Sequence, residues 1–265
     1  MSVKKEPSGK RSVQVEVEVP GTPEEVWRAI STGEGISSWF VQAKVEGEVG
    51  GKMVLNFGPG MESTATVTAW EPPLRFAAED QWGGENGPVI ATEWFVEARS
   101  GGVCVVRVVH SLFAETDDWD NQLEGTEGGW PLYFRVLRLY LSHFRGMHGA
   151  SFVATGFSTE SLSQTWSKLM QLLSSVDAKE GEKYKAGTDV PQISGTVEWI
   201  RESKTEPAIM LILDRPGIVI FSAANCGGPI MVAASFYFYG ASAPDVSQQE
   251  AAWQAWMNQK FPSES

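Results

Sequence analysis

His110 is the residue of this chain whose type and position best suit it to chemistry. It lies near the end of a strand-like segment, Val103–Phe113. If Arg107 points to solvent, strand alternation places His110 on the inner face of a sheet. There an imidazole could orient a carbonyl or hydroxyl of a ligand, or act as an acid or base in a cavity enzyme. We favour a histidine whose hydrogen bonds are satisfied within the fold, because no Asp or Glu beside it in sequence completes a base.

An acidic cluster follows that strand and comprises Glu115, Asp117, Asp118 and Asp120. A hard cation needs several oxygens that converge on one point, whereas acidic residues also gather at loops and helix N-termini. We adopt the second interpretation. The chain has only 3 His and 2 Cys, and it lacks the motifs of a P-loop, a zinc protease, a calcium loop, a serine hydrolase or a dinucleotide site. We therefore expect no metal, no cofactor and no catalytic residue, and we favour a protein that is not an enzyme.

The most informative stretch runs from Gly128 to Phe144. At helical spacing it has one apolar, largely aromatic face and one polar face, which predicts a long amphipathic helix. Such a helix, placed after a series of strands, either fills a core or covers a cavity. The apolar face comprises Trp130, Tyr133, Phe134, Leu137, Leu141 and Phe144, and the polar face Arg135, Arg138, Ser142 and Arg145.

The elements before this helix predict an α+β fold in which a curved antiparallel sheet is covered by it. An alternating strand over 13–19 leads to a capping box, Thr22 to Glu25, that starts a short helix. A second helical turn, Ile36–Phe40, follows breaks at Gly33 and Gly35. Glu115 to Asn121 is expected to be a cap or short helix, and Gln81 to Gly87 a loop that could serve as a lid. The expected strands are Val41–Glu46, Lys52–Phe57, Thr64–Trp70, Arg75–Ala78, Ile90–Ala98 and Val103–Phe113, and alternation turns Thr92, Trp94, Val96, Cys104, Val106, Val108, His110 and Leu112 inward.

After residue 148 the pattern restarts, so we predict one domain over 12–147 and a second α+β domain over 148–265. The second domain is either a diverged, shortened half-repeat of the first or an unrelated unit. Its capping box runs from Ser161 to Gln164, and a charged loop covers Asp177 to Asp189. The expected strands are Ala150–Gly156, Gln192–Ile200, Ala208–Asp214, Gly217–Ala223 and Ile230–Tyr239, and the expected last helix is Asp245 to Lys260.

Composition narrows the class of partner. The 265 residues carry a net charge of −12, which argues against nucleic acid and anionic membrane surfaces as partners. The two cysteines, Cys104 and Cys226, provide no disulfide framework, and no apolar run approaches the length of a membrane span. We expect a cytoplasmic protein without membrane insertion. The 11 Trp and 13 Phe suit either a core or a pocket for a flat apolar ligand.

Several motifs of the first 147 residues resemble a known superfamily. The segment Val17-x-Val19-Pro20-x-Thr22-Pro23-Glu24-Glu25-Val26-Trp27 resembles the opening of START-like (SRPBCC, helix-grip) domains. Trp39-Phe40, Val49-Gly50-Gly51-Lys52, Val109-His110-Ser111 and Gly128-Gly129-Trp130 are similar to the bacterial branch named after the heat shock protein 90 ATPase activator. The resemblance covers residues 12–147 and implies a curved sheet that grips a C-terminal helix, with a cavity between them.

Members of this superfamily bind lipids, sterols, polyketides and other hydrophobic molecules, and a few are cyclases, hydrolases or ring-hydroxylating subunits. The fold alone therefore does not fix the function. The eukaryotic chaperone activator also has an N-terminal domain with its own chaperone-contacting motif. We find no such segment in this sequence, so the family's name does not by itself imply a chaperone or stress-response role.

Our main hypothesis is non-catalytic binding of a small hydrophobic molecule, lipid or polyketide-like, between sheet and helix. One alternative is a cyclase- or hydrolase-type cavity enzyme that uses His110. Another is a co-chaperone-like interaction module, with a homodimer or a chaperone contact left open, and a solidly filled core remains a third outcome. The ligand-binding candidates are Trp130, Tyr133, Phe134 and Leu137 on the helix, Trp94, Val108 and His110 on the sheet, and Trp39, Phe40 and Trp82 near the mouth.

Overall fold

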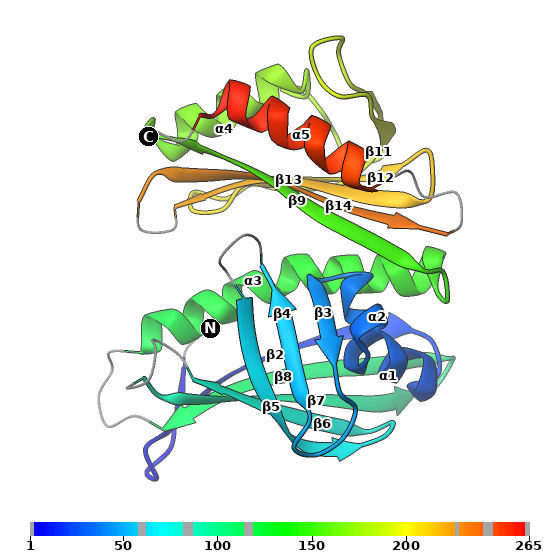
Figure 1. Ribbon diagram of the computed structural model, residues 1–265, viewed down its shortest axis with the longest axis vertical. Coiled ribbons are helices and arrows are strands. Elements are labelled where there is room, and N and C mark those ends of the chain that lie inside the picture. The colour runs from blue at the N-terminus through cyan, green and yellow to red at the C-terminus, as the bar shows by residue number, and fades with distance from the viewer. Residues whose placement is uncertain are drawn as a thin grey trace. The chain divides into compact units, whose positions relative to one another are not determined.

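The chain folds into two compact units, Met1–Met147 and His148–Ser265. A computed structural model describes residues 3–57, 62–81, 87–113, 119–225, 228–240 and 246–262, without the side chains of 121, 122, 126 and 127. Each unit has its own antiparallel sheet and its own helices, so the α+β class predicted from the sequence is confirmed (Figure 1).

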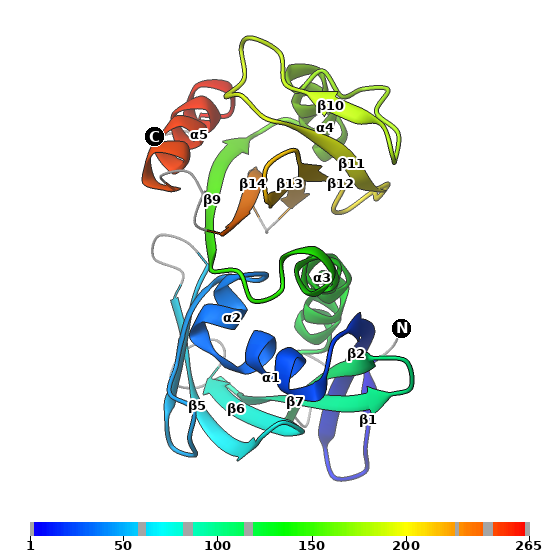
Figure 2. The same cartoon turned by 90° about the vertical axis from the view of Figure 1, so that its right-hand side faces the viewer.

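The first unit has an eight-stranded sheet in the order β1-β2-β8-β7-β6-β5-β4-β3. The first long strand, β2, therefore pairs with β8, the last strand of the unit in sequence. The strands from β3 to β8 each pair with the next one along the chain and form a meander. In Figure 2 the view runs nearly along α3, the long helix of this unit, and the sheet curves around it. The elements are β1 (Lys4–Lys5), β2 (Lys10–Pro20), α1 (Pro23–Ser31), α2 (Gly33–Ser37), β3 (Gln42–Val45), β4 (Lys52–Asn56), β5 (Glu62–Glu71), β6 (Arg75–Gln81), β7 (Val89–Arg99), β8 (Val103–Phe113), α3 (Asp120–Leu139) and the π-helical turn η1 (Tyr140–Phe144).

The capping box predicted at the start of α1 is present. The Thr22 hydroxyl accepts a hydrogen bond from the Glu25 backbone N–H at 3.3 Å, and the Glu25 carboxylate accepts one from the Thr22 N–H at 2.8 Å. The Arg145 guanidinium also binds this carboxylate. Together these donors, the Thr22 N–H first, lower the pKa of Glu25. The start of α1 is thus tied to the chain that follows η1.

The break expected at Gly33 is present, because α1 ends at Ser31, but Gly35 does not break a helix. It lies inside α2, which spans Gly33–Ser37 rather than the expected Ile36–Phe40. Thr32 caps this short helix by accepting a hydrogen bond from the Gly35 N–H at 3.0 Å. A Cβ at position 35 would lie 2.1 Å from the Arg28 carbonyl oxygen, so the glycine permits α1 and α2 to approach closely. Its role is a packing role rather than a helix stop.

Helix α3 begins at Asp120, two turns before the Gly128 start expected from the sequence. The glycines at 125, 128 and 129 and the proline at 131 hid this first part, because both residue types weaken helices. The Asp120 carboxylate holds the helix start through ion pairs of 2.7 Å to Lys5 and 2.7 Å to Arg11. The aromatic face is buried as predicted at Trp130, Phe134, Leu137, Leu141 and Phe144, with Tyr133 half-buried, and burial extends also to Val136, Leu139 and Tyr140.

The second unit repeats the strand connections of the first on a smaller scale. Its sheet order is β10-β11-β12-β13-β14-β9, so again the opening strand lies beside the last strand of a meander. The loop expected over Asp177 to Asp189 contains the short strand β10, because Lys183–Lys185 pairs with Ser194–Thr196. The elements are β9 (Gly149–Ser158), α4 (Leu162–Leu172), β10 (Lys183–Lys185), β11 (Ser194–Arg201), β12 (Ala208–Leu213), β13 (Gly217–Asn225), β14 (Ile230–Tyr239) and α5 (Val246–Lys260).

One backbone detail recurs in both units. In the first, the Gly50 N–H donates to the Val67 carbonyl at 2.8 Å, and the Val67 N–H donates to Gly51 at 2.9 Å. In the second, the Gly181 N–H donates to Val197 at 2.8 Å, and the Val197 N–H donates to Glu182 at 2.9 Å. Both valines are followed directly by a β-bulge, and Gly50 and Gly181 share the left-handed conformation, with φ of 88° and 85°.

Aromatic rings pack the interface between sheet and helix in the second unit. Trp253 of α5 is fully buried, with its ring centroid 4.9 Å from that of Phe236 and 5.5 Å from that of Phe221. The same helix covers the open edge of β9, beside which it lies in Figure 2. The Gln254 amide accepts from the Thr155 N–H at 3.0 Å and donates to the Thr155 carbonyl at 2.7 Å, which blocks further strand pairing there.

We predict that Thr22→Ala lowers the free energy of unfolding of the first unit by about 1 kcal/mol, because the substitution removes the hydroxyl that caps α1. Chemical denaturation followed by tryptophan fluorescence measures the change. Thr22→Ser, which keeps the hydroxyl, is the matched control and should stay close to the wild type. Equal losses in both variants would contradict a capping role.

Candidate ligand-binding cavity

The first unit has a partly open cavity of about 480 Å³ between the sheet and α3. Its wall is mostly apolar, and it is built from β4 to β8 on the sheet side and from α1, α2, the segment after α2, and α3 on the other. The lining residues are Ile30, Ile36, Trp39, Phe40, Met53, Leu55, Phe57, Ser63, Ala65, Phe76, Ala78, Asp80, Gln81, Ile90, Thr92, Trp94, His110, Gly125, Gly129, Trp130 and Tyr133. This size and this chemistry suit a small hydrophobic molecule.

The structure places most of the sequence-predicted site residues in this wall. Those that line it are Trp39, Phe40, Trp94, His110, Trp130 and Tyr133. Val108, Phe134 and Leu137 are buried but do not line it. Phe134 packs against Trp94 and Trp130, with ring centroids 6.2 and 5.3 Å away. These two indoles line the cavity in its place. Trp82 lies outside the described residues.

Interlocking aromatic rings form the helix side of the cavity. The Trp130 ring lies 5.1 Å from that of Trp94 and 5.3 Å from that of Phe40, and Tyr133 meets Phe40 edge-to-face at 4.6 Å. The Trp39 indole N–H donates to the Ala29 carbonyl at 2.9 Å, which fixes that ring against α1. Edge-to-face and offset contacts of this kind stabilise a single arrangement of rings.

His110 bridges the sheet and the helix at the base of the cavity. The Trp130 indole N–H donates to His110 Nε2 at 2.7 Å, and His110 Nδ1 lies 3.0 Å from the Thr92 hydroxyl. An indole nitrogen is only a donor, so Nε2 is the acceptor and the neutral ring carries its proton on Nδ1. Both ring nitrogens are therefore engaged within the protein, as in the interpretation we favoured from the sequence.

Burial of the ring lowers the pKa of His110 from its ordinary value of 6.5 to about 4. The imidazole is thus neutral at physiological pH, and neither nitrogen is available to take a proton from a ligand. This arrangement argues against His110 as a general base, and it leaves the residue the role of a polar anchor.

A second polar group in the wall, formed by Asp80 and Ser63, was not predicted from the sequence. The Asp80 carboxylate accepts a hydrogen bond from the Ser63 hydroxyl at 2.5 Å and another from the Gln81 backbone N–H at 2.7 Å. The expected strand stopped at Ala78, whereas β6 continues to Gln81. Alternation from Phe76 through Ala78 would have placed Asp80 on the inner face.

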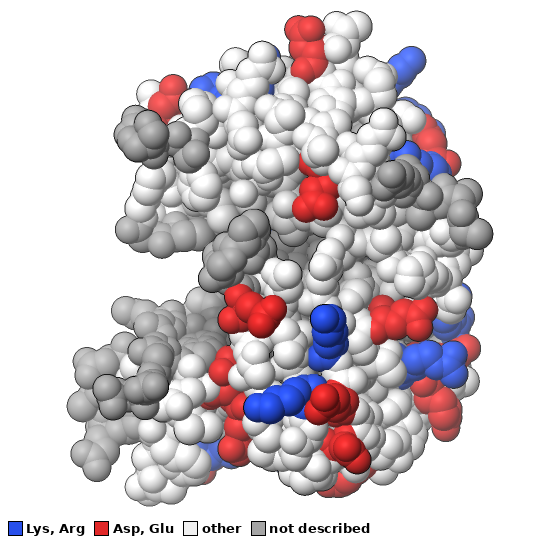
Figure 3. Space-filling view, viewed as in Figure 1, with Lys and Arg blue, Asp and Glu red and all other residues white. Residues whose placement is uncertain are grey.

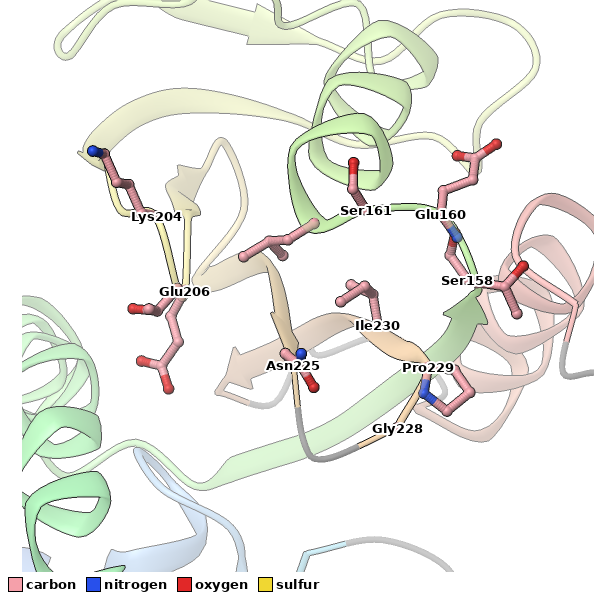
Figure 4. A pocket seen from close by; sticks show the side chains of 12 residues that line it. Ser158, Glu160, Ser161, Lys204, Glu206, Asn225, Gly228, Pro229 and Ile230 are labelled. Atoms are coloured by element: carbon pink, nitrogen blue, oxygen red, sulfur yellow. The ribbon is translucent and has the colours of Figure 1, made fainter. Parts of the chain in front are cut away.

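A second opening, of about 620 Å³, lies in the second unit around the start of α4 (Figure 4). Its polar groups are largely used by the fold, because Ser161 caps α4 and Ser158 accepts from the Thr165 hydroxyl at 3.0 Å. In Figure 4 Lys204 and Glu206 lie on one side and Glu160 on the other, so their charged ends do not converge on one point. We therefore retain the cavity of the first unit as the candidate site.

Two of the remaining sequence candidates, Cys104 and Asp120, lie within the described residues, and both are bound within the fold. Cys104 donates to the Gly21 carbonyl at 3.3 Å, and burial raises the pKa of its thiol; Cys226 lies outside the described residues. Of the acidic cluster, only Asp120 falls within the described ranges, and it is paired with Lys5 and Arg11. The part of the chain that the structure describes contains no cluster of three or more metal-binding His, Cys, Asp or Glu side chains.

The surface of the first unit carries charges of both signs. On the face of the first unit drawn in Figure 3, acidic and basic side chains lie interspersed. Some charged side chains of the first unit form ion pairs, since Arg75 pairs with Glu71 at 2.8 Å and with Glu93 at 2.9 Å. Within the described ranges, no helix has the length and apolar character needed to cross a membrane.

A curved antiparallel sheet that holds a long helix above an apolar cavity defines a helix-grip protein. The family described as "Activator of Hsp90 ATPase homolog 1-like protein" (AHSA1) matches residues 20–142. The match covers 123 of the 265 residues, all of them in the first unit, and confirms the resemblance inferred from the motifs of that unit. A search of the curated proteins finds no match to the chain.

Three solved structures are among those similar to the chain. Protein MLL2253 from Mesorhizobium loti is 22% identical, with 50% of this chain and 97% of that chain covered and a TM-score of 0.46. CalU16 from Micromonospora echinospora is 21% identical, with coverages of 54% and 83% and a TM-score of 0.43. DynU16, from the dynemicin biosynthetic locus, is 16% identical, with coverages of 95% and 96% and a TM-score of 0.43. At these values no conclusion about ligand or activity follows.

We predict that the stability of the first unit falls as pH drops from 6.5 towards 4. The unfolded chain protonates His110 near 6.5, whereas the folded protein resists protonation until about 4. The contribution of the neutral ring is complete above 6.5 and is lost as pH falls through the folded value, a change of about 3 kcal/mol. Urea denaturation across this pH range measures it.

Other groups titrate in the same range, so matched variants isolate the effect. His110→Asn should be less stable than the wild type near pH 7, and the difference should shrink as pH falls. His143→Asn, which replaces an exposed histidine, should keep the wild-type profile. A difference between wild type and His110→Asn that does not change with pH would contradict the buried neutral ring.

Proposed function

We propose that the first unit binds a small hydrophobic ligand in the cavity between its sheet and α3, without catalysing a reaction. The observation that supports this proposal is unfilled space beside α3, at positions where a larger side chain would fit. Gly129, which is half-buried, and Gly125, which is exposed, both line the cavity, and a Cβ at either position would meet no atom within 4 Å. Voids destabilise proteins, so an aromatic-lined cavity of this size is best explained by an occupant.

The glycines that line the cavity lower the stability of α3. A glycine in a helix interior is about 1 kcal/mol less favourable than alanine, and no crowding at these two positions requires glycine. Alanine would stabilise α3 and narrow the cavity at the same time. The presence of glycine at these positions thus favours a binding role over a filled core, and it agrees with the hydrophobic ligands that START-like proteins bind.

Two further inferences belong to the proposal. We infer that the second unit is a diverged, shortened repeat of the first, because both share strand connections and the Gly50–Val67 and Gly181–Val197 hydrogen-bond pattern. The engaged nitrogens of His110 make a cavity enzyme the weaker alternative. The chaperone activity in the family's name is not part of the proposal.

We predict that Gly129→Leu abolishes binding of N-phenyl-1-naphthylamine, a neutral apolar dye, because the new side chain occupies the cavity. The matched control is Gly128→Leu on the same helix, since Gly128 is exposed and does not line the cavity. Dye fluorescence measures the affinity, and far-ultraviolet circular dichroism confirms that both variants fold. Native mass spectrometry of gently purified wild type tests for a retained natural ligand.

The proposal fails if the wild type does not bind the dye, or if Gly128→Leu and Gly129→Leu reduce its affinity equally. Either result would indicate a site outside the cavity or a core that admits no ligand.

A further inference from the structure

We propose that the cavity selects an uncharged ligand with a hydrogen-bond acceptor, such as a ketone oxygen, and that the Thr92 hydroxyl donates the hydrogen bond. This inference deepens the proposed function and rests on it, since it requires a ligand in the same cavity. Two features carry it: the direction of the hydrogen bonds through His110, and the charge of the wall around Thr92.

The hydrogen bonds through His110 have only one self-consistent direction. Trp130 can only donate, so it fixes Nε2 as the acceptor at 2.7 Å. The neutral imidazole then holds its single proton on Nδ1, which must donate to the Thr92 oxygen at 3.0 Å. With its oxygen serving as an acceptor from the ring, the Thr92 hydroxyl directs its own proton elsewhere.

The Thr92 hydroxyl is thus free to donate its proton to a ligand in the cavity. Thr92 lines the cavity, and the described residues offer its hydroxyl no other hydrogen bond than the one to His110. A donor that loses contact with water and gains no acceptor costs free energy, so a ligand gains by placing an oxygen here. Burial also keeps the His110 ring neutral, with a pKa of about 4, and this maintains the same direction across physiological pH.

Asp80 determines which acceptors fit. It pairs across the strands with Ile90, two residues before Thr92, so Asp80 and Thr92 are diagonal neighbours on one face of the sheet, roughly 7 to 8 Å apart. The described lining contains no Lys or Arg to neutralise the carboxylate. A ligand carboxylate near Thr92 would meet this negative charge, whereas a ketone would not. The wall therefore favours a neutral carbonyl compound over a fatty acid.

The test compares fluorene with 9-fluorenone, two flat molecules of nearly equal size that differ at one carbon, a CH₂ or a carbonyl. The wild type should bind fluorenone about tenfold more tightly, the value of one hydrogen bond. Thr92→Val should lose this preference while it still binds fluorene, and Thr92→Ser should keep it. Isothermal titration or tryptophan quenching measures the affinities.

A second measurement does not depend on how a variant folds. The infrared carbonyl stretch of fluorenone bound to the wild type should shift to lower wavenumber, as in a hydrogen-bonded ketone. For charge selection, 9-fluorenone-4-carboxylate should bind the wild type more weakly than fluorenone, and Asp80→Asn should reduce that difference.

The outcomes separate this inference from the proposed function. If neither fluorene nor fluorenone binds, ligand binding in the cavity fails and the inference falls with it. If both bind with equal affinity, or if the carbonyl stretch is unshifted, the cavity binds ligands but Thr92 does not select them. A preference for fluorenone that survives Thr92→Val would overturn the role of Thr92 alone.

Discussion

The hydrogen bond from the Trp130 indole to His110 is the interaction on which the cavity depends. It joins α3 to β8 across the interior, at 2.7 Å, in a place where water does not compete. The surrounding rings of Trp94 and Phe40 hold the indole in position, and these contacts set the spacing between α3 and the sheet. The glycines of α3 then leave space that larger side chains would fill.

The two units show how one set of strand connections leads to different interiors. Both place the opening strand beside the last strand of a meander and lay a terminal helix against the sheet. In the second unit Trp253 reaches from that helix into a cluster with Phe221 and Phe236. In the first, Gly125 and Gly129 of the terminal helix line a cavity. Both terminal helices thus place aromatic rings against their sheets, but only the helix of the first unit also contributes glycines to a cavity wall.

Local patterns in the sequence were enough to predict the capping boxes, the inward face of β8 and the aromatic face of α3, because each depends on residues close together in the chain. The cavity itself was not predictable in this way, since its volume depends on how distant side chains pack. Asp80 was missed because its strand runs three residues longer than expected. The start of α3 was missed because Asp120 is held by Lys5 and Arg11, which are remote in sequence.

The most direct test of this account is nitrogen-15 NMR of the His110 imidazole in the full-length protein, with His110→Asn to assign the signals. The account predicts a neutral ring near pH 7 that carries its proton on Nδ1, with Nε2 unprotonated and the Trp130 indole proton shifted by a strong hydrogen bond. A ring protonated on Nε2, or a ring that becomes charged near pH 6.5, would contradict it.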